Sequence, residues 1–395
     1  MNSPRIDTIY QTIEVKYRFP VSFTSGLFEI ENPVFRDTLV GRDNNKTHRL
    51  VCIVDDGVAE TCTSLIRNIQ TYIDTNRKNL SLARSPIVVP GGETIKNDQE
   101  LREHLHQVIV DAKLDRHSYV VGIGGGALLD AVGFVAATAH RGIRHIRVPT
   151  TVLAQGDSAA SVKNGVNRYG KKNYLGTFSP PHAVINDYNF IAALPDRDKV
   201  SGMAEAIKVA LVKDRFFFDW LEKHHAKLAR FDADAMQYMI RRCTELHMSE
   251  IMRHGDPFEN GHARPLAFGH WAAHRLETLT NFTLKHGEAV AIGMAIDARY
   301  SVLSNHLAPG GDERLCRLLE NLGFSLWNDA LLDNNSSGER GILQGINDFN
   351  EQIGGELSIT LLADIGEGLA VDSIDVDRVL SAIDWLSSRL NNIAA

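Results

Sequence analysis

Short apolar runs alternate with amphipathic segments between residues 50 and 150, and polar residues or glycines follow each run. The segments at 60–76 and 99–112 carry apolar residues at helical spacing, which predicts two helices. This alternation is typical of a parallel sheet covered by helices on both faces. We therefore predict an α/β fold for this part of the chain, with strands at 50–54, 86–89, 119–123 and 146–148.

The pattern changes near Leu194-Pro195, after which helical periodicity dominates. We predict an α/β domain over 1–195 and a mostly α-helical domain over 196–395. An alternating run from Ile13 to Val21 predicts one more strand near the N-terminus. The helices expected in the second domain lie at 200–213, 216–225, 234–252, 266–279, 287–304 and 311–322.

Composition limits the class of protein. Of the 395 residues, 44% are hydrophobic and 23% are charged, as in ordinary globular proteins. The net charge of −7 argues against a general nucleic-acid binder. The four cysteines show no paired spacing, and the first residues contain no apolar signal segment, so we expect a cytoplasmic protein in a reducing compartment.

The most apolar stretch, residues 119–139, is not expected to cross a membrane. It contains several glycines and the central Asp130, which would be costly in lipid. A buried strand, a glycine turn and a buried helix explain this stretch better, and no membrane partner is predicted.

The turn Gly122-Ile-Gly-Gly-Gly126 connects the predicted strand to the predicted helix. Glycines at Gly125 and Gly126 would let the backbone approach a pyrophosphate, and the helix N-terminus offers free N–H groups. The turn does not match GxGxxG, so a tight turn without a ligand is the plain alternative. Asp130, in the first turn of the helix, suits either the helix dipole or a polar contact to a cofactor.

Polar residues follow the other predicted strands as well. Asp55, Glu93 to Lys96, and the pair Thr150 and Thr151 each come after an apolar run. The carboxyl ends of parallel strands share one edge of a sheet, so these side chains should line a single cleft. Asp55 would suit a ribose hydroxyl. Each residue alone is more typical of a turn, but together they predict a ligand site between the two domains.

Several motifs, in order, resemble those of the 3-dehydroquinate synthase family, which belongs to the sugar phosphate cyclases. They are GIGGGALLDAVG, RVPTTVLAQGDSAASVKNGVN, GKKN, GMAEAIKVALVKD, FGHWAAH and HGEAVAIGM, and the resemblance extends from about residue 50 to 365. It implies an NAD-binding α/β domain, a helical metal-binding domain and a homodimer.

The resemblance also implies a role for each matching residue. Metal ligands, for Zn²⁺ or Co²⁺, would be Glu205, His270 and His286. NAD would contact Asp55, Glu93, Lys96, Gly125, Gly126, Asp130, Thr150, Thr151, Asp157 and Lys172. Catalytic and substrate contacts would be Asp157, Lys163, Asn173, Lys208 and His274, with Arg141 reaching the substrate phosphate in the neighbouring subunit.

The chemistry of these residues agrees with a metal site but does not require one. One glutamate and two histidines suit zinc with an open coordination position. The alternative for Glu205 is an ion pair with Lys208 at i,i+3. His270 and His274 share a helix face at i,i+4, which would suit two metal ligands, whereas the resemblance assigns His274 to the substrate. His286 could simply begin a helix.

The segment after Asp157 is expected to form a cationic loop with Lys163, Lys171, Lys172 and Asn173. Together with Arg141, these groups could neutralise a phosphate and a pyrophosphate. A solvated loop is the plain alternative for any single lysine.

The sequence departs from the family pattern at positions that are expected to bind the substrate. Ser249 stands where the family has a helix lysine, Arg264 is displaced by one position, and Ala267 replaces an asparagine. A late family lysine falls in Asn350-Glu351. Cationic groups that would hold a substrate carboxylate are thus missing, which would cost several kcal/mol for a buried carboxylate.

We therefore predict a lyase that forms a cyclitol from sedoheptulose 7-phosphate or a similar seven-carbon sugar phosphate. It would eliminate phosphate and close the ring by an intramolecular aldol reaction, with NAD recycled. The alternative is a 3-dehydroquinate synthase in which Arg264 still holds the carboxylate of 3-deoxy-arabino-heptulosonate 7-phosphate. A metal-dependent polyol dehydrogenase is a second alternative, and a non-enzymatic scaffold is disfavoured by the complete ligand set.

Overall fold

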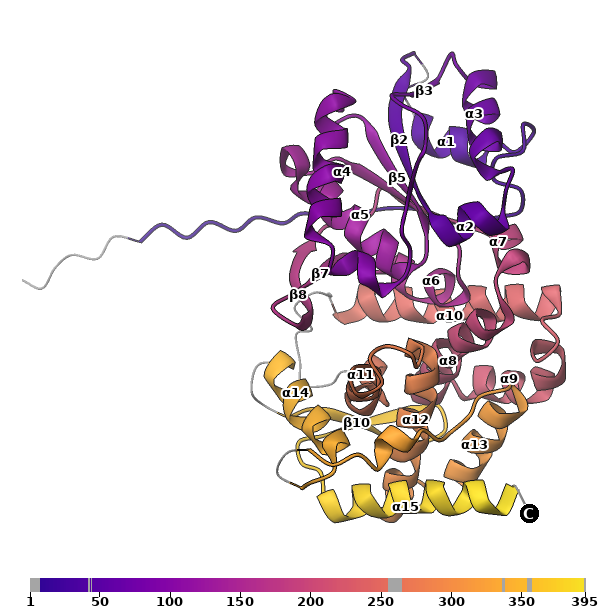
Figure 1. The fold of residues 1–395 in the computed structure, drawn as a ribbon, viewed down its shortest axis with the longest axis vertical. Coiled ribbons are helices and arrows are strands. Elements are labelled where there is room, and N and C mark those ends of the chain that lie inside the picture. The colour runs from indigo at the N-terminus through magenta and orange to yellow at the C-terminus, as the bar shows by residue number, and fades with distance from the viewer. Residues whose placement is uncertain are drawn as a thin grey trace, which may run out of the picture.

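The computed structural model describes residues 8–41, 43, 45–254, 265–335, 338–353 and 357–393. Figure 1 shows a sheet-containing part above a helical part, with the long helix α10 (Ala233–His254) lying where they meet. The sheet uses residues 21 to 187, and helices dominate from residue 196. We keep the proposal of a domain boundary near residue 195, which falls between α7 (Tyr188–Ala193) and α8 (Asp196–Lys213).

The sheet has seven strands, and every strand pair within it is parallel. The strand order is β1-β9-β6-β5-β2-β3, and β4 also pairs with β2. The predicted parallel α/β arrangement is therefore confirmed. The strands are β1 (Val21–Thr24), β2 (His48–Asp55), β3 (Leu80–Leu82), β4 (Ile87–Val89), β5 (Tyr119–Gly124), β6 (Arg144–Pro149) and β9 (Ala183–Asp187).

Helices cover both faces of this sheet. On one face, α1 (Val34–Val40) and α3 (Leu65–Thr75) pack on the strands. On the other face, α4 (Gln99–Asp111) and α5 (Gly126–Thr138) do the same. Because both faces are buried, β5 is buried along its whole length, as the uninterrupted apolar runs indicated.

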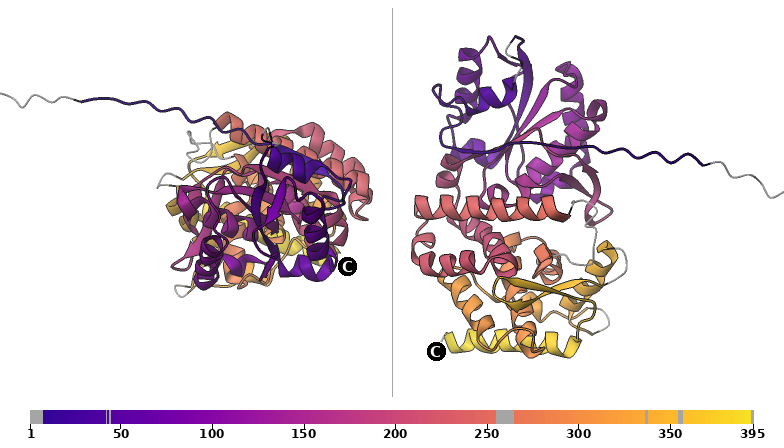
Figure 2. Two further views of the ribbon diagram at one scale, coloured as in Figure 1. Left: turned by 90° about the horizontal axis from the view of Figure 1, so that it is seen from above. Right: turned by 180° about the vertical axis from the view of Figure 1, so that it is seen from behind.

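Two local predictions in this part were wrong. The helix expected at 60–76 is divided into α2 (Asp56–Thr61) and α3, because Cys62 leaves the helical conformation after α2. The strand expected from Ile13 to Val21 is absent, and β1 begins only at Val21. Residues 8–18, here called the N-terminal arm, extend away from the body, so they find no neighbouring strand (Figure 2).

The expected cationic loop is instead a hairpin of β7 (Lys163–Arg168) and β8 (Lys171–Phe178). Tyr169 and Gly170 form its turn, both with positive φ, as two-residue hairpin turns of type I′ require. The buried guanidinium of Arg147 anchors the first strand, donating to the carbonyl of Lys163 at 3.2 Å and to Asn164 Oδ1 at 2.7 Å. Most of β8 is exposed and both strands contain a glycine, so the sequence shows no regular alternation of apolar and polar residues here.

The helical part surrounds α8 and α12 (His286–Leu303), both of which are apolar on nearly all sides. A helix of this composition is expected in the centre of a core. Most predicted helices are confirmed, whereas the hairpin of β10 (Ile359–Asp364) and β11 (Glu367–Val371) was not predicted. The remaining helices are α6 (Val152–Gly156), α9 (Arg215–Leu228), α11 (His270–Leu279), α13 (Gly311–Asn321), α14 (Gln344–Ile353) and α15 (Val376–Ile393).

Among the described residues, no helix combines the length and apolar character needed to cross a membrane. The apolar stretch 119–139 forms β5, a glycine turn and α5, as predicted.

Candidate active site

Three side chains from three helices meet below the carboxyl edge of the sheet. Glu205 lies in the middle of α8, whereas His270 and His286 begin α11 and α12. One ligand atom from each lies within 4.8 Å of the others. Separations of 65 and 16 residues bring these groups together only in the folded chain.

The distances in this cluster leave room for an ion. Glu205 Oε1 lies 3.8 Å from His270 Nε2 and 3.6 Å from His286 Nε2. Glu205 is 1% exposed, and its Oε1 has no hydrogen-bond partner in the described chain, whereas Oε2 faces Lys208. The predicted ion pair with Lys208 also forms, and it is buried rather than on the surface.

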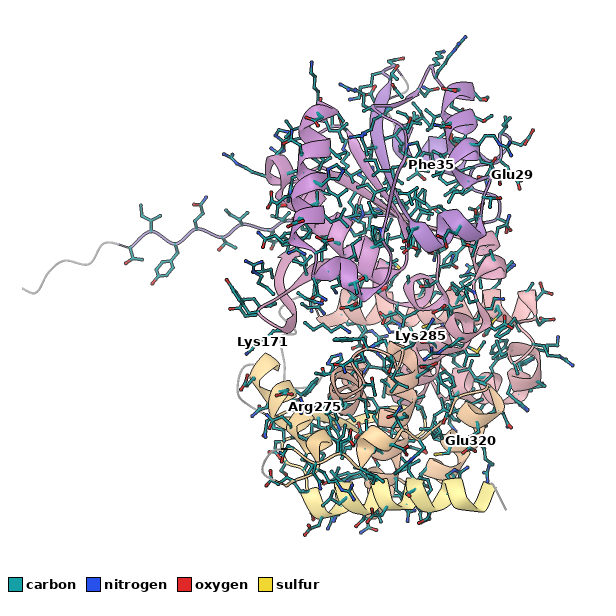
Figure 3. All side chains as sticks on the ribbon, in the orientation of Figure 1. Glu29, Phe35, Lys171, Arg275, Lys285 and Glu320 are labelled. Atoms are coloured by element: carbon teal, nitrogen blue, oxygen red, sulfur yellow. The ribbon has the colours of Figure 1, made fainter. Side chains whose placement is uncertain are left out.

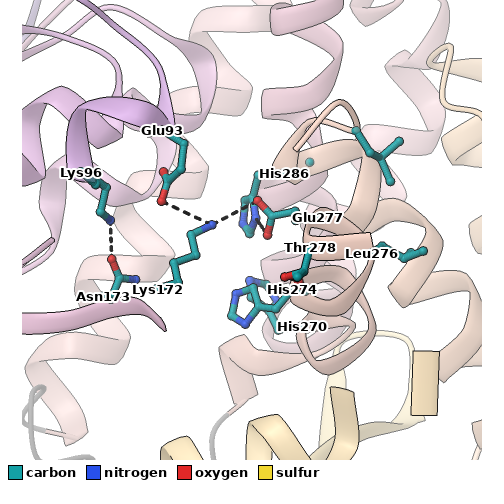
Figure 4. Close-up of polar contacts among 12 residues, drawn as sticks. Glu93, Lys96, Lys172, Asn173, His270, His274, Leu276, Glu277, Thr278 and His286 are labelled. Atoms are coloured by element: carbon teal, nitrogen blue, oxygen red, sulfur yellow. Dashed lines mark hydrogen bonds and ion pairs between the residues drawn. The ribbon is translucent and has the colours of Figure 1, made fainter. Parts of the chain in front are cut away.

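The other ring nitrogens of the two histidines are occupied. His270 Nδ1 lies 3.1 Å from the carbonyl of Phe268, and His286 Nδ1 lies 3.1 Å from Glu277 Oε2. Both contacts favour a proton on Nδ1, so in the neutral imidazoles Nε2 is the nitrogen available to an ion beside Glu205. Figure 4 shows His286, Glu277 and the neighbouring His274 grouped on this side of the site.

Electrostatics in this cluster favour an ionised carboxylate. Burial raises the pKa of Glu205, but Lys208 and the two histidines outweigh it and hold this pKa well below its usual range. Burial lowers the pKa of His274 to about 3, with His286 and Lys172 adding to the effect, so His274 is neutral near pH 7. For His286, the neighbouring carboxylates of Glu205 and Glu277 outweigh burial and raise the pKa to about 9, so a cation bound at its Nε2 would displace a proton.

The backbone before α11 is held in place by a buried carboxylate. Asp297 accepts from the Gly269 N–H at 2.8 Å and from Trp271 Nε1 at 2.9 Å, so its two bonds flank His270. Gly269 has a φ of +77°, and a Cβ there would lie 2.7 Å from the amide nitrogen of Met294. Glycine at this position therefore allows the backbones of α11 and α12 to approach closely.

A cavity of about 610 Å³ runs along the carboxyl ends of the strands and reaches His286. The glycine turn forms one wall, and Lys285, at the start of α12, contributes from the helical part (Figure 3). The hydroxyl of Thr150 is buried without a hydrogen-bond partner in the described chain. The predicted convergence is confirmed for the residues that line this cavity, namely Asp55, Gly125, Gly126, Thr150 and Thr151.

Two of these residues also have local structural roles. Asp55 Oδ1 accepts from the Val58 N–H at 3.3 Å, and Thr151 accepts from the Ala154 N–H at 3.1 Å, so both cap helices. A Cβ on Gly91 would collide with the Asp55 carboxylate. Glycine there keeps space around this acid, whose pKa is raised by burial.

Glu93, Lys96 and Asp130 do not line this cavity but form a polar cluster beside it. Lys96, 3% exposed, donates to Asp130 Oδ2 at 2.8 Å and also to Asn173 on β8. Burial raises the pKa of Asp130, and Lys96 opposes that rise. The β7–β8 hairpin therefore docks on the sheet part through Asn173.

Lys172, next to Asn173, connects the two parts of the molecule. Its Nζ lies 3.1 Å from Glu277 Oε1 on α11 and 3.9 Å from Glu93 Oε1 (Figure 4). Lys172 therefore bridges the sheet part and the acid that orients His286.

Two functional candidates escaped the sequence analysis. Glu277 was missed because only the fold brings it to His286. His247, on α10, is buried, with Nε2 3.4 Å from Asp157 Oδ1. One potential ligand atom from each of Asp157, Glu205 and His247 also lies within 4.8 Å of the other two. Ser249 stands where the family has a lysine on this helix. Two positions earlier, His247 contacts Asp157, which was predicted to bind the substrate.

Some predicted residues are not brought into the site of this chain. Arg141 is exposed at the far end of α5, whose 13 residues separate it from the glycine turn by about 20 Å. Lys163 begins β7, at the opposite end of this strand from the hairpin turn beside which Lys172 lies. Arg264, which the substrate prediction depends on, lies outside the described residues.

Comparisons with known proteins agree with this geometry. Models of the 3-dehydroquinate synthase N-terminal and C-terminal domains match residues 86–201 and 202–338. A curated 3-dehydroquinate synthase from Halorhodospira halophila is 36% identical over 284 residues, which span 72% of this chain and 78% of that protein.

Two solved structures share the fold. The 2-epi-5-epi-valiolone synthase ValA from Streptomyces hygroscopicus, with NAD⁺ and Zn²⁺ bound, has a TM-score of 0.84 at 24% identity, covering 96% of this chain and all of that chain. A 2-deoxy-scyllo-inosose synthase complexed with carbaglucose-6-phosphate, NAD⁺ and Co²⁺ has a TM-score of 0.74 at 22% identity, covering 92% and 96%. Together, the matched domains and the identity to a curated relative show that this chain is an enzyme of the 3-dehydroquinate synthase family of sugar phosphate cyclases.

Proposed function

We propose that this enzyme converts a seven-carbon sugar phosphate without a carboxylate, of the sedoheptulose 7-phosphate type, into a cyclitol. Phosphate would be eliminated, and an intramolecular aldol reaction would then close the ring. The observation that carries the substrate proposal is the pairing of the lysines around the His–Glu cluster. Each of Lys96, Lys172 and Lys208 already faces a carboxylate of the chain.

A carboxylate on the substrate would lack a cationic partner beside this cluster. Glu205, Glu277 and Asp157 already bring negative charge to the cluster, and the lysines beside them are engaged. A buried carboxylate without a cationic partner is strongly disfavoured, whereas a hydroxyl needs only ordinary hydrogen bonds. Seven-carbon sugars without an acid group fit this balance of charge better.

We infer that Glu205, His270 and His286 hold a divalent cation, Zn²⁺ or Co²⁺. The two Nε2 lone pairs and the unpartnered Glu205 Oε1 supply the nitrogen and oxygen donors that zinc prefers, and three ligands leave a position for substrate. A bound cation would act as a Lewis acid on a substrate oxygen. Glu277 would hold His286 in the required tautomer.

NAD would occupy the cavity along the strand ends and supply reversible hydride transfer. Gly125 and Gly126 would admit its pyrophosphate at the start of α5, where free N–H groups and the helix dipole favour an anion. Thr150 offers an unpartnered hydroxyl, and Asp55 a carboxylate suited to a ribose. The adjacent residues Glu93, Lys96, Asp130, Thr151, Asp157 and Lys172 would complete the site.

The substrate would lie between the hairpin and α11. Lys163 and Asn173 would bind it from the hairpin, and Lys208, whose charge Glu205 balances, would donate a hydrogen bond to a hydroxyl from α8. Neutral His274 can accept a hydrogen bond at a ring nitrogen, and Asp157 can accept one from a hydroxyl. We propose a homodimer in which the partner's Arg141 reaches the phosphate, since Arg141 lies too far from its own site.

A second candidate is 3-dehydroquinate synthase activity on 3-deoxy-arabino-heptulosonate 7-phosphate. The name of the 36% identical relative favours it. In that case Arg264, or another group, would have to balance the carboxylate.

The two candidates separate in one assay. Purified protein with NAD and Zn²⁺ or Co²⁺ would receive each sugar phosphate separately, and released phosphate and product mass would be measured. We expect release from sedoheptulose 7-phosphate alone. Release from the carboxylated sugar alone would contradict the substrate proposal while leaving the cyclase class intact.

A further inference from the structure

The N-terminal arm exposes a row of large apolar side chains. Ile9 and Tyr10 are each 91% exposed, Ile13 is 73% exposed, and Val15 and Tyr17 are more than half exposed. From Ile13 onward the apolar residues alternate with Glu14, Lys16 and Arg18, which is the pattern of a strand with one apolar face. This amount of apolar surface on an extended segment calls for a partner.

A second unpartnered feature lies on the β7–β8 hairpin. Within the described chain, β8 forms strand pairs with β7 alone, so its other edge is open. Tyr174, Leu175 and Phe178 on this strand are each 40% or more exposed. An exposed strand edge with apolar side chains is a template for strand addition.

The two features match in length and character. The arm has 11 residues and β8 has eight, so the fully extended arm, at about 3.3 Å per residue, spans the whole strand. Tyr174 and Phe178 lie on the same face of β8 because side chains alternate along a strand. Ile13, Val15 and Tyr17 likewise share one face of the extended arm. When the arm is added to the edge of β8, these two apolar rows can therefore lie side by side on one face of the sheet and shield each other from water.

The arm forms no strand pair with its own β8 among the described residues. Tyr17 contacts Phe178, with ring centroids 5.7 Å apart, and the residues before it lead away from the body (Figure 2). Phe19 packs on the core, and the Pro20 carbonyl accepts the Val184 N–H at 3.0 Å. Residues 8–19 contain no glycine, asparagine or aspartate that would favour a sharp reversal.

We propose that the N-terminal arm pairs as an added strand with the open edge of β8 in a second copy of this chain. Two identical exchanges would form a closed, two-fold symmetric dimer. The strand that receives the arm carries Lys172 and Asn173, so the exchange would brace the segment that contacts Glu277 and Lys96. This assembly does not depend on which sugar the enzyme uses.

Photo-crosslinking tests the exchange directly. Ile13→Cys, made in a Cys62→Ser background because the other three native cysteines are buried, would carry a benzophenone. Lys16→Cys, on the polar face of the arm, is the matched control. We expect Ile13→Cys to give a covalent dimer joined to residues 171–178, severalfold more than Lys16→Cys. A product of monomer size, joined to 171–178 of the same chain, would overturn the exchange.

Hydrogen exchange provides a second measurement that does not depend on labelling. Removing residues 1–18 should speed exchange of the outward-facing amides of β8 about tenfold or more, because they would lose the strand that covers them. Amides of the central strand β5 serve as the control and should not change. Unaltered exchange along β8, together with a lack of crosslinks to 171–178, would also overturn the proposal.

Discussion

Glu277 Oε2 lies 3.1 Å from Nδ1 of His286, and the other oxygen of the same carboxylate lies 3.1 Å from Nζ of Lys172. One buried acid therefore orients a proposed metal ligand on the helical part and also receives a lysine from the hairpin on the sheet part. The contact between the two parts and the geometry of the proposed metal site are thus coupled through Glu277.

Glu277→Gln should weaken metal binding by about 10- to 100-fold, the usual effect of losing a carboxylate that orients a metal-bound histidine. Competition with a chelator measures this affinity. Glu245→Gln, at a half-exposed acid on α10, serves as the control. Metal affinity equal to that of the control would show that Glu277 does not position His286.

His270→Ala should abolish both stoichiometric metal binding and phosphate release, because only two of the three proposed ligands remain. NAD binding should persist, since the cavity lining does not include His270. Atomic absorption measures the metal content, and calorimetry measures the NAD affinity. His117→Ala, at an exposed histidine, is the control, and a metal-loaded, active His270→Ala protein would contradict the ligand assignment.

Gly269→Ala should lower the free energy of unfolding by about 2–4 kcal/mol, since it combines a left-handed backbone with backbone collision at Met294. Gly310→Ala is a matched control, because Gly310 also has positive φ but open space around its Cβ position. The control should lose only about 1 kcal/mol. Equal losses in denaturant titrations would mean that packing against α12 is unimportant.

Asp297 should make stability fall as pH rises. Burial raises its pKa to about 7, and the bonds from Trp271 and Gly269 oppose this only in part. The folded protein therefore keeps a proton that the unfolded chain has released. Between about pH 4 and pH 7 this group should lower the free energy of unfolding by up to about 1.4 kcal/mol per pH unit, and its contribution should level off above that range.

Asp297→Asn isolates this contribution, because asparagine does not titrate. The difference in unfolding free energy between the original protein and the variant should decrease with pH up to about 7 and then become constant. A difference that is independent of pH across this range would mean that the Asp297 carboxyl is ionised throughout.

The sequence predicted the sheet part well because buried parallel strands leave uninterrupted apolar runs. The polar residues at the strand ends, including Asp55 and Thr150, could be placed on one edge because parallel strands all end there. Glu205 lies on a nearly all-apolar helix, so the sequence allowed either a metal ligand or an ion pair with Lys208. The fold shows that the ion pair forms and is buried.

The remaining features could not be predicted from local pattern. The β7–β8 hairpin lacks a clean alternation, since Gly165 and Gly176 interrupt it and most of β8 is exposed. Glu277 and His247 acquire significance only from neighbours that lie far away in sequence. The segment predicted as a strand at Ile13 has the right alternation but no partner strand among the residues that the structure describes.

We propose that this enzyme is a cyclase that recycles NAD beside a metal held by Glu205, His270 and His286. The most direct measurement follows phosphate release and NADH absorbance together, with sedoheptulose 7-phosphate as substrate. We predict many equivalents of phosphate per enzyme with no net NADH. Accumulation of NADH in step with substrate consumption, without phosphate release, would contradict the claim and indicate a polyol dehydrogenase.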